Sequence, residues 1–158
     1  MFRPAAAFVI LILSGFCAPG SGAAVYSSDG SAASVQALQN AAHDGDTITL
    51  PAGTFSWTSS PGITKAITLQ GATTVTGAGG PNPTVNDVTI VKDDVPRNST
   101  ILSVSLEGNR VFRLTGITFA PGAGQVNGST DGAFHFSSPD LTARVRIDHC
   151  HFASLHQA

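Results

Sequence analysis

Two histidines and an aspartate near the end of the chain could bind a metal ion. Asp148, His149 and His151 fall within a stretch of four residues, and imidazole nitrogens and carboxylate oxygens are common ligands of divalent metals. Two histidines alone leave such a site short of ligands. Hydrogen bonding at a sharp corner of the backbone is therefore the competing interpretation of these residues.

Three further side chains could contact a ligand. Arg113 and Arg146 each stand between two apolar residues of an alternating segment, and His135 stands between Phe134 and Phe136. Because strand side chains alternate between two faces, all three are expected to point outward. A guanidinium fork matches a carboxylate, so the two arginines could bind an acidic sugar. An ordinary solvated strand surface is the alternative for all three residues.

The first 23 residues have the features of a signal peptide. Arg3 precedes an apolar run over residues 5–13, and Ser21 and Ala23 fit the small-x-small pattern that predicts cleavage after Ala23. The run is shorter than the roughly 20 residues of a membrane span. An uncleaved anchor is the alternative, but we expect a secreted, periplasmic or cell-surface protein with no membrane segment after cleavage.

Composition narrows the possible partners. After removal of residues 1–23, seven Lys and Arg face ten Asp and Glu, so the net charge is about −3 and nucleic acid is not an expected partner. Cys150 is then the only cysteine, which rules out an intrachain disulfide within this segment. The chain contains no P-loop, G-x-G-x-x-G, G-x-S-x-G or H-E-x-x-H motif.

One helix is predicted before a series of short strands. Residues 32–43 place apolar side chains on one helical face, and Asp44-Gly45-Asp46 ends the helix. The predicted apolar face consists of Val35, Leu38, Ala41 and Ala42. The predicted strands are residues 46–50, 54–57, 65–70, 88–91, 101–106, 111–114, 117–119, 133–136 and 144–147, with a Gly/Pro/Asn loop at 77–87.

An internal repeat links these strands. Residues 112–119 align with residues 145–152, 33 positions later, as apolar, Arg, apolar, two turn residues, apolar, polar, Phe. The alignment puts His149 at the corner position of Gly116 and His151 at the outward position of Thr118. Ile-Thr-Leu also recurs at Ile48 and Ile67, and Val88-Thr-Ile90 varies it.

These patterns predict an all-β fold of the right-handed parallel β-helix type. Residues 101–106 and 133–137 would supply a third strand to each repeat, giving three strands per coil. One coil cannot bury its own inner face, so stacked coils would build the core and the helix at residues 32–43 would cap its N-terminal end. A β-sandwich with an accidental repeat is the alternative fold.

Several segments resemble pectin-lyase-like parallel β-helix proteins. Residues 44–55 and 67–71 are similar to the opening of such proteins, and residues 114–119 and 146–152 resemble their coil signatures. The last segment also resembles alginate-lyase and chondroitinase-B-like polysaccharide lyases. The resemblance covers about residues 30–155 and specifies coils rather than chemistry.

The resemblance implies a secreted carbohydrate-active protein of the polysaccharide-lyase type that acts on acidic glycans. It implies β-elimination with a Lys or Arg as base and calcium as a possible cofactor, on coils further along than any in this chain. No catalytic residue is therefore assigned. In related lyases the sugar groove runs along the first strand of each coil, so His135 would face the groove if the strand at 133–137 is that strand.

Two alternatives stay open. The first is a non-catalytic glycan-binding protein, with coils that serve as a rigid adhesin or tailspike-like shaft. The second is that residues 24–158 are the cap and first coils of a truncated domain, because residues 153–158 do not form a convincing C-terminal cap. We expect the full-length protein to be monomeric and to have a polysaccharide as its partner.

Overall fold

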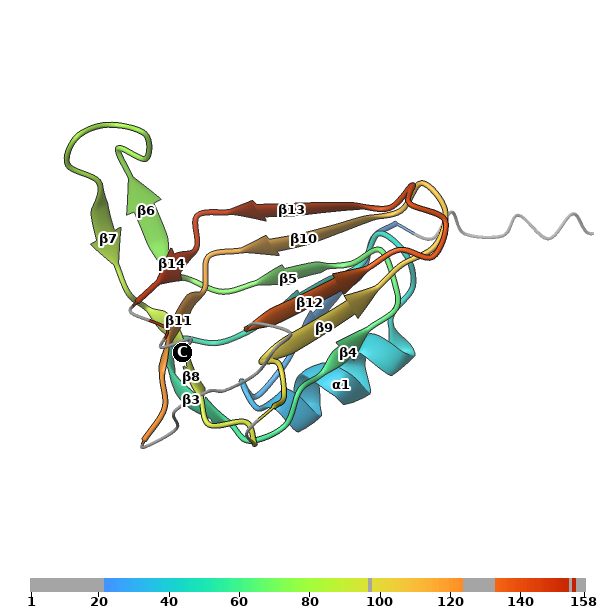
Figure 1. The fold of residues 1–158 in the computed structure, drawn as a ribbon, viewed down its shortest axis with the longest axis horizontal. Coiled ribbons are helices and arrows are strands. Elements are labelled where there is room, and N and C mark those ends of the chain that lie inside the picture. The colour runs from blue at the N-terminus through green and yellow to red at the C-terminus, as the bar shows by residue number, and fades with distance from the viewer. Residues whose placement is uncertain (1–21, 97, 124–132, 154, 156–158) are drawn as a thin grey trace, which may run out of the picture.

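The computed structural model describes residues 22–96, 98–123, 133–153 and 155. These residues form short strands and one short helix (Figure 1). The predicted signal peptide lies outside the described residues, apart from Gly22 and Ala23. No helix among the described residues is long and apolar enough to cross a membrane.

Three sheets contain only parallel strand pairs. In spatial order, sheet A contains β1 (Val25–Ser27), β2 (Thr47–Thr49), β5 (Thr68–Gln70), β10 (Val111–Thr115) and β13 (Arg144–Asp148). Sheet B contains β14 (His151–Phe152), β11 (Thr118–Pro121), β8 (Thr89–Asp93) and β3 (Gly53–Trp57). Sheet C contains β12 (Phe134–Ser137), β9 (Leu102–Ser105) and β4 (Gly62–Ile63). An antiparallel hairpin of β6 (Thr74–Thr76) and β7 (Thr84–Asn86) projects between β5 and β8 (Figure 1).

The chain enters sheets A, B and C in a fixed order, and we call each passage a round. The rounds are β2-β3-β4, β5-β8-β9 and β10-β11-β12, and β13-β14 begin another. The prediction of an all-β fold with parallel pairing and one short helix is confirmed at this level. The loop predicted at residues 77–87 is wrong in part, because β7 lies within it.

The 33-residue repeat corresponds to strand pairing. Phe112 pairs with Val145 in sheet A, and Phe119 pairs with Phe152 in sheet B, as the alignment predicts. The recurrence of Ile-Thr-Leu does not correspond to strand pairing, because Ile48 pairs with Leu69 rather than Ile67. The spacings of 19 residues from Ile48 to Ile67 and 21 residues from Ile48 to Leu69 both keep an apolar side chain on the inner face. The alternation alone could therefore not select between them.

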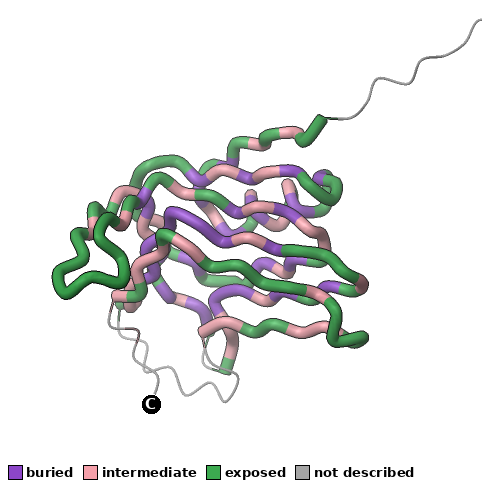
Figure 2. Tube along the Cα trace, turned by 90° about the horizontal axis from the view of Figure 1, so that it is seen from above, coloured by how far each residue is buried: buried purple, intermediate pink, exposed green. Residues whose placement is uncertain are grey.

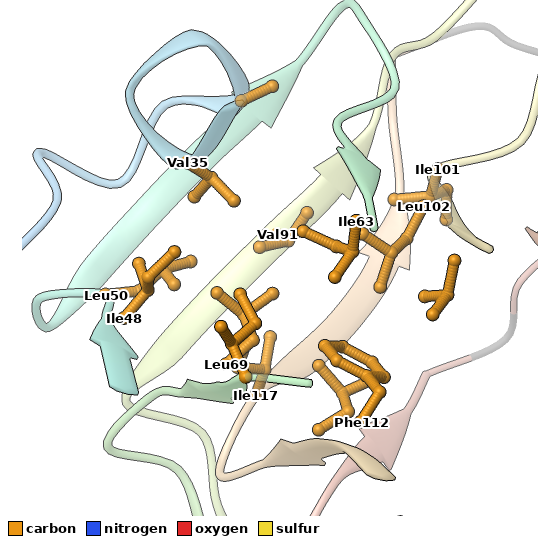
Figure 3. Close-up of a cluster of buried hydrophobic side chains, with 14 of the residues drawn as sticks. Val35, Ile48, Leu50, Ile63, Leu69, Val91, Ile101, Leu102, Phe112 and Ile117 are labelled. Atoms are coloured by element: carbon orange, nitrogen blue, oxygen red, sulfur yellow. The ribbon is translucent and has the colours of Figure 1, made fainter. Parts of the chain in front are cut away.

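The buried residues lie on the strands of the three sheets (Figure 2). The core lies between these sheets, where the inward side chains of successive rounds pack together (Figure 3). Figure 3 shows Ile48, Leu69 and Phe112 among them, from three different rounds. Aromatic rings continue this packing, with Phe119 edge-on to Phe134 at 4.8 Å between ring centres and stacked on Phe152 at 5.8 Å.

The helix α1 (Ala32–Ala41) packs against β2 and β4 at the β2 end of the core. Its N-cap is Ser31, whose hydroxyl accepts a hydrogen bond from the Ser34 N–H at 3.1 Å. Ala41 is exposed, contrary to the predicted apolar face, and Gln39 is buried instead. The Gln39 Nε2 donates to the Gly62 carbonyl at 3.0 Å, whereas its buried Oε1 has no hydrogen-bond partner among the described residues. Apolar periodicity alone would place this side chain outside.

The last round is covered on one side only. Val145 and Ile147 are each 40% exposed, although their partners Phe112 and Leu114 are fully buried. Among the described residues no strand pairs with the outer edge of β13. Inward-facing apolar side chains are therefore open to solvent on this face of the structure.

Two glycines let the corners between sheets A and B stack closely. The Gly71 N–H donates to the Thr115 carbonyl at 2.9 Å, and the Thr73 N–H donates to the Gly116 carbonyl at 2.8 Å. Gly116 has φ +69°, and a Cβ at this position would lie 2.5 Å from the Gly71 carbonyl oxygen. A side chain here would be strained and would also collide with backbone.

We predict that Gly116→Ala destabilises the protein far more than Gly108→Ala. Gly108 also has a positive φ, +67°, but a Cβ there meets nothing within 4 Å. The free energy of unfolding of the Gly108→Ala control should fall only by the cost of the left-handed conformation, roughly 1–2 kcal/mol. That of Gly116→Ala should fall clearly more. Equal free energies of unfolding for the two variants, measured by urea denaturation, would contradict close corner stacking.

Candidate functional site

A cluster of charged side chains lies on the outer face of sheet A, where that sheet turns into sheet B. Its centre is the Asp148 carboxylate. Arg113 binds this carboxylate through Nε at 3.0 Å and Nη2 at 2.9 Å, and Arg146 binds it through Nε at 2.5 Å. Thr115 donates its hydroxyl at 2.6 Å, and His149 Nδ1 lies at 3.0 Å. We call these five residues the Asp148 cluster.

Strand pairing assembles the Asp148 cluster. Arg113 pairs with Arg146, and Thr115 pairs with Asp148, across the parallel strands β10 and β13. Residues two apart on a strand share a face, so both pairs project from the same side of sheet A. The sequence placed Arg113 and Arg146 on adjacent outward positions, and the structure has them there.

The Asp148 cluster carries an excess of positive charge. Two guanidinium groups bind one carboxylate, so positive charge exceeds negative charge even when His149 is neutral. The hydrogen bond from Arg113 is the largest cause that holds the pKa of Asp148 far below its usual range, and Thr115 acts in the same direction. The same pair raises the pKa of Arg113. Arg146 uses only Nε in this contact, and its side chain is 66% exposed, so its two terminal nitrogens face solvent.

His149 occupies the corner in an unusual backbone conformation. Its φ is +52°, and the equivalent position one round earlier is Gly116, with φ +69°. A non-glycine residue in this region is strained, although histidine tolerates it better than most residues. The conformation directs Nδ1 toward Asp148, so Nε2 is left for a ligand or for solvent.

A cleft of about 310 Å³ adjoins the Asp148 cluster. It is lined by Gln70, Gly71, Ala72, Thr73, Thr74, Thr115, Gly116 and His149. Thr115 and His149 therefore belong both to the cleft and to the Asp148 cluster. The lining combines hydroxyl, amide and backbone groups with apolar surface. We call it the corner cleft.

A second hydrogen-bond network lies on the sheet B side of the same corner. His151 Nδ1 lies 2.9 Å from Asp87 Oδ1, and Thr118 donates to the same oxygen at 2.6 Å. The Thr118 and Thr73 hydroxyls are 3.1 Å apart and buried. The hydrogen bond from Thr118 is the largest cause that lowers the pKa of Asp87. Asp87 and the threonines were not predicted, because hydroxyl-rich strands give no pattern that marks one threonine among many.

The structure divides the residues predicted to bind a metal. Asp148 pairs with His149, whereas His151 pairs with Asp87. Within the part of the chain that the structure describes, no three His, Cys, Asp or Glu side chains form a group that could hold a metal ion. The Asp148 cluster does not fit the calcium that the family resemblance implies, because calcium needs six or more oxygen ligands and guanidinium groups already bind this carboxylate. The metal site stays a prediction.

His135 lies apart from the Asp148 cluster. It is on β12 of sheet C, where it pairs with Ser103, and it is exposed. Ser105 and Ser137 pair beside them. His135 therefore points outward as predicted, on a different sheet from Arg113 and Arg146. No contact of His135 among the described residues indicates a binding role, which stays a prediction.

Comparison with known proteins gives no relative for this chain. No family model matches it, and neither a curated protein nor a solved structure does.

We predict that Asp148→Asn destabilises the protein by about 1–3 kcal/mol, because charge-assisted hydrogen bonds to two arginines weaken. The effect should depend on pH. The folded-state pKa of Asp148 is lowered. The contribution of its carboxylate to the free energy of unfolding is therefore complete above the unfolded pKa of about 3.9 and is lost as the pH falls below that value. Urea denaturation between about pH 7 and pH 3 measures this.

Glu107→Gln is the matched control, since it removes one carboxylate charge from an exposed residue with no ion pair among those described. An effect of Asp148→Asn no larger than that of Glu107→Gln would show that the Asp148 cluster contributes nothing to stability.

Proposed function

We propose that this protein is an exported carbohydrate-active protein that acts on acidic glycans, similar to polysaccharide lyases, and that its three sheets are the walls of a right-handed parallel β-helix. The repeated order of sheets A, B and C supports this fold, because parallel strands joined by crossovers in one direction wind around a common core. The right hand follows from the strong preference of parallel crossover connections. The predicted signal peptide supports export.

The observation that carries the functional proposal is the corner cleft with the Asp148 cluster beside it. Sugars present many hydroxyl groups, and the exposed Gln70 and Thr74 side chains offer an amide and a hydroxyl partner in the cleft. Arg146 has its terminal nitrogens free of described partners and can bind a carboxylate through two parallel hydrogen bonds. A uronic acid combines both kinds of group in one unit.

The corner cleft can support elimination chemistry in one specific way. In β-elimination a base removes the proton next to the uronate carboxylate, a carbon–carbon double bond forms, and the carbon–oxygen bond to the next sugar breaks. Negative charge builds up on the carboxylate during proton removal, and a fixed guanidinium stabilises such charge. Arg146 is the residue of this chain that we assign to that role, and we assign no residue as the base.

We predict that the protein binds a galacturonate trisaccharide and that Arg146→Gln weakens binding about tenfold, equivalent to the loss of about 1.4 kcal/mol. The methyl ester of the same trisaccharide, which lacks the charge, should bind more weakly than the acid. Isothermal titration calorimetry measures both.

Arg144→Gln is the control for Arg146→Gln. Arg144 lies on the same face of β13, two residues earlier, and makes no contact with Asp148 among the described residues. The control removes the same charge and should bind like the wild type. Equal weakening by both substitutions would indicate diffuse attraction rather than a site, and would contradict the assignment to the corner cleft.

Turnover separates the two carbohydrate roles. Incubation of the protein with pectate, alginate and chondroitin sulfate should release an unsaturated uronate, detected by its ultraviolet absorbance, if the protein is a lyase. Binding of one of these glycans without an unsaturated product would instead favour a non-catalytic glycan-binding protein. Neither binding nor turnover with any of the three would contradict the proposed function.

A further inference from the structure

Among the described residues, Ala24 is the first that forms hydrogen bonds with the rest of the fold. Its N–H donates to Asp46 Oδ1 at 2.7 Å, and its carbonyl accepts from the Thr47 N–H at 2.8 Å. Strand β1 follows at once and forms the edge of sheet A. Ala24 is also the first residue after the predicted signal-peptide cleavage point. The residue that the predicted cleavage would make the N-terminus is therefore one that the fold holds by two hydrogen bonds.

Asp46 is a buried carboxylate at this point of the fold. The residue is 5% exposed, between the end of α1 and the start of β2. Its Oδ2 accepts the His43 N–H at 2.7 Å, and its Oδ1 accepts the Ala24 N–H. These two hydrogen bonds, that of His43 first, lower the pKa of Asp46, so the carboxylate is charged at neutral pH.

The positive groups near Asp46 are imperfect partners. The His43 imidazole is 86% exposed, with Nδ1 3.9 Å from Oδ2. The Lys65 ammonium donates instead to the Asn40 and Ala42 carbonyls. A buried carboxylate without a close cation carries a desolvation cost, which a hydrogen-bonded cation would offset.

We propose that cleavage between Ala23 and Ala24 creates this cation, and that the new α-ammonium group of Ala24 forms an ion pair with Asp46 that fixes the start of the fold. A signal peptidase would hydrolyse the amide with one water molecule, so that Ala23 receives the carboxylate and Ala24 the ammonium. The nitrogen that donates to Asp46 as an amide would then donate as a charged group, which forms a stronger hydrogen bond.

The surroundings of Ala24 leave room for the ammonium. Gly22, Ala23 and Ala24 line a cleft of about 330 Å³ together with Tyr26 and residues 43–46. Removal of Gly22 and Ala23 would open this cleft to water, which can solvate the remaining ammonium protons. The ion pair would also tie down β1, a strand of three residues whose Val25 is 67% exposed. This inference does not depend on the proposed carbohydrate role.

The experiment compares four proteins, each exported from the full chain with its own leader. They are the wild type, a variant with one glycine inserted between Ala23 and Ala24, Asp46→Asn, and the double variant. Intact mass should show that the wild type begins at Ala24. The inserted glycine moves the amine away but keeps the Ala24 N–H as an amide. It should lower the Tm by about 3–6 °C, and this loss should largely vanish when Asp46 is replaced.

Three results would overturn the inference. They are an exported protein that begins at another residue, a glycine insertion without effect on the Tm, and an equal loss of Tm with and without Asp46. The last two would mean that the insertion acts sterically or not at all, rather than through charge.

If Asp46→Asn does not fold, a pH comparison of the wild type and the insertion variant replaces the comparison of the four proteins. The pKa of a free α-amino group is about 7.7–8.0 in an unfolded chain, and pairing raises it, so the added stability is present below that pH and is lost at higher pH. The other titratable and charged groups around the pair are common to both proteins and cancel in the difference. They are Tyr26, His43, Asp44, Lys65 and Arg110. A difference in Tm that persists unchanged to about pH 10 would overturn the ion pair.

Discussion

Stacking of inward side chains along parallel strands is the interaction on which the rest of this structure depends. A single round of three strands cannot cover its own apolar face, so each inward residue must pack against its equivalent one round away. Phe112 and Phe119, which pair with Val145 and Phe152, are fully buried for this reason. The residues of the last described round, such as Val145, are half exposed because they have a described neighbouring strand on one side only.

The same stacking determines where polar chemistry can occur. Since most of the inner face is committed to packing, the charged side chains of the Asp148 cluster lie on the outer face and at the corner, where parallel register brings equivalent positions side by side. Arg113 and Arg146 meet over Asp148 because they occupy one outward position in two successive rounds. A cationic pair of this kind suits an acidic sugar better than an apolar ligand.

The corners impose a different constraint. Where one round lies directly on another, Gly71 and Gly116 allow backbones to approach more closely than a Cβ would permit. At the equivalent corner of the last round, His149 adopts the same left-handed conformation at a cost in strain. The exchange of glycine for histidine places an imidazole beside the corner cleft, where Asp148 orients it. His149 thus combines a strained backbone with a polar side chain that is directed toward Asp148.

The sequence by itself determined the features that depend on local periodicity. The alternation of apolar and polar residues predicted short strands, and the 33-residue repeat predicted which residues pair in β10 and β13, because side chains that stack must share an inward position. The outward direction of His135, Arg113 and Arg146 followed from the same alternation.

Tertiary structure alone decided which outward groups meet. It joined His151 to Asp87 across 64 residues and separated it from Asp148, because the hairpin β6–β7 returns the chain to that corner. It also buried Gln39, where the Gly62 carbonyl and the Thr64 hydroxyl accept hydrogen bonds from its Nε2. Partners such as these come from distant segments whose spacing carries no periodic signal, so only the folded chain brings them together.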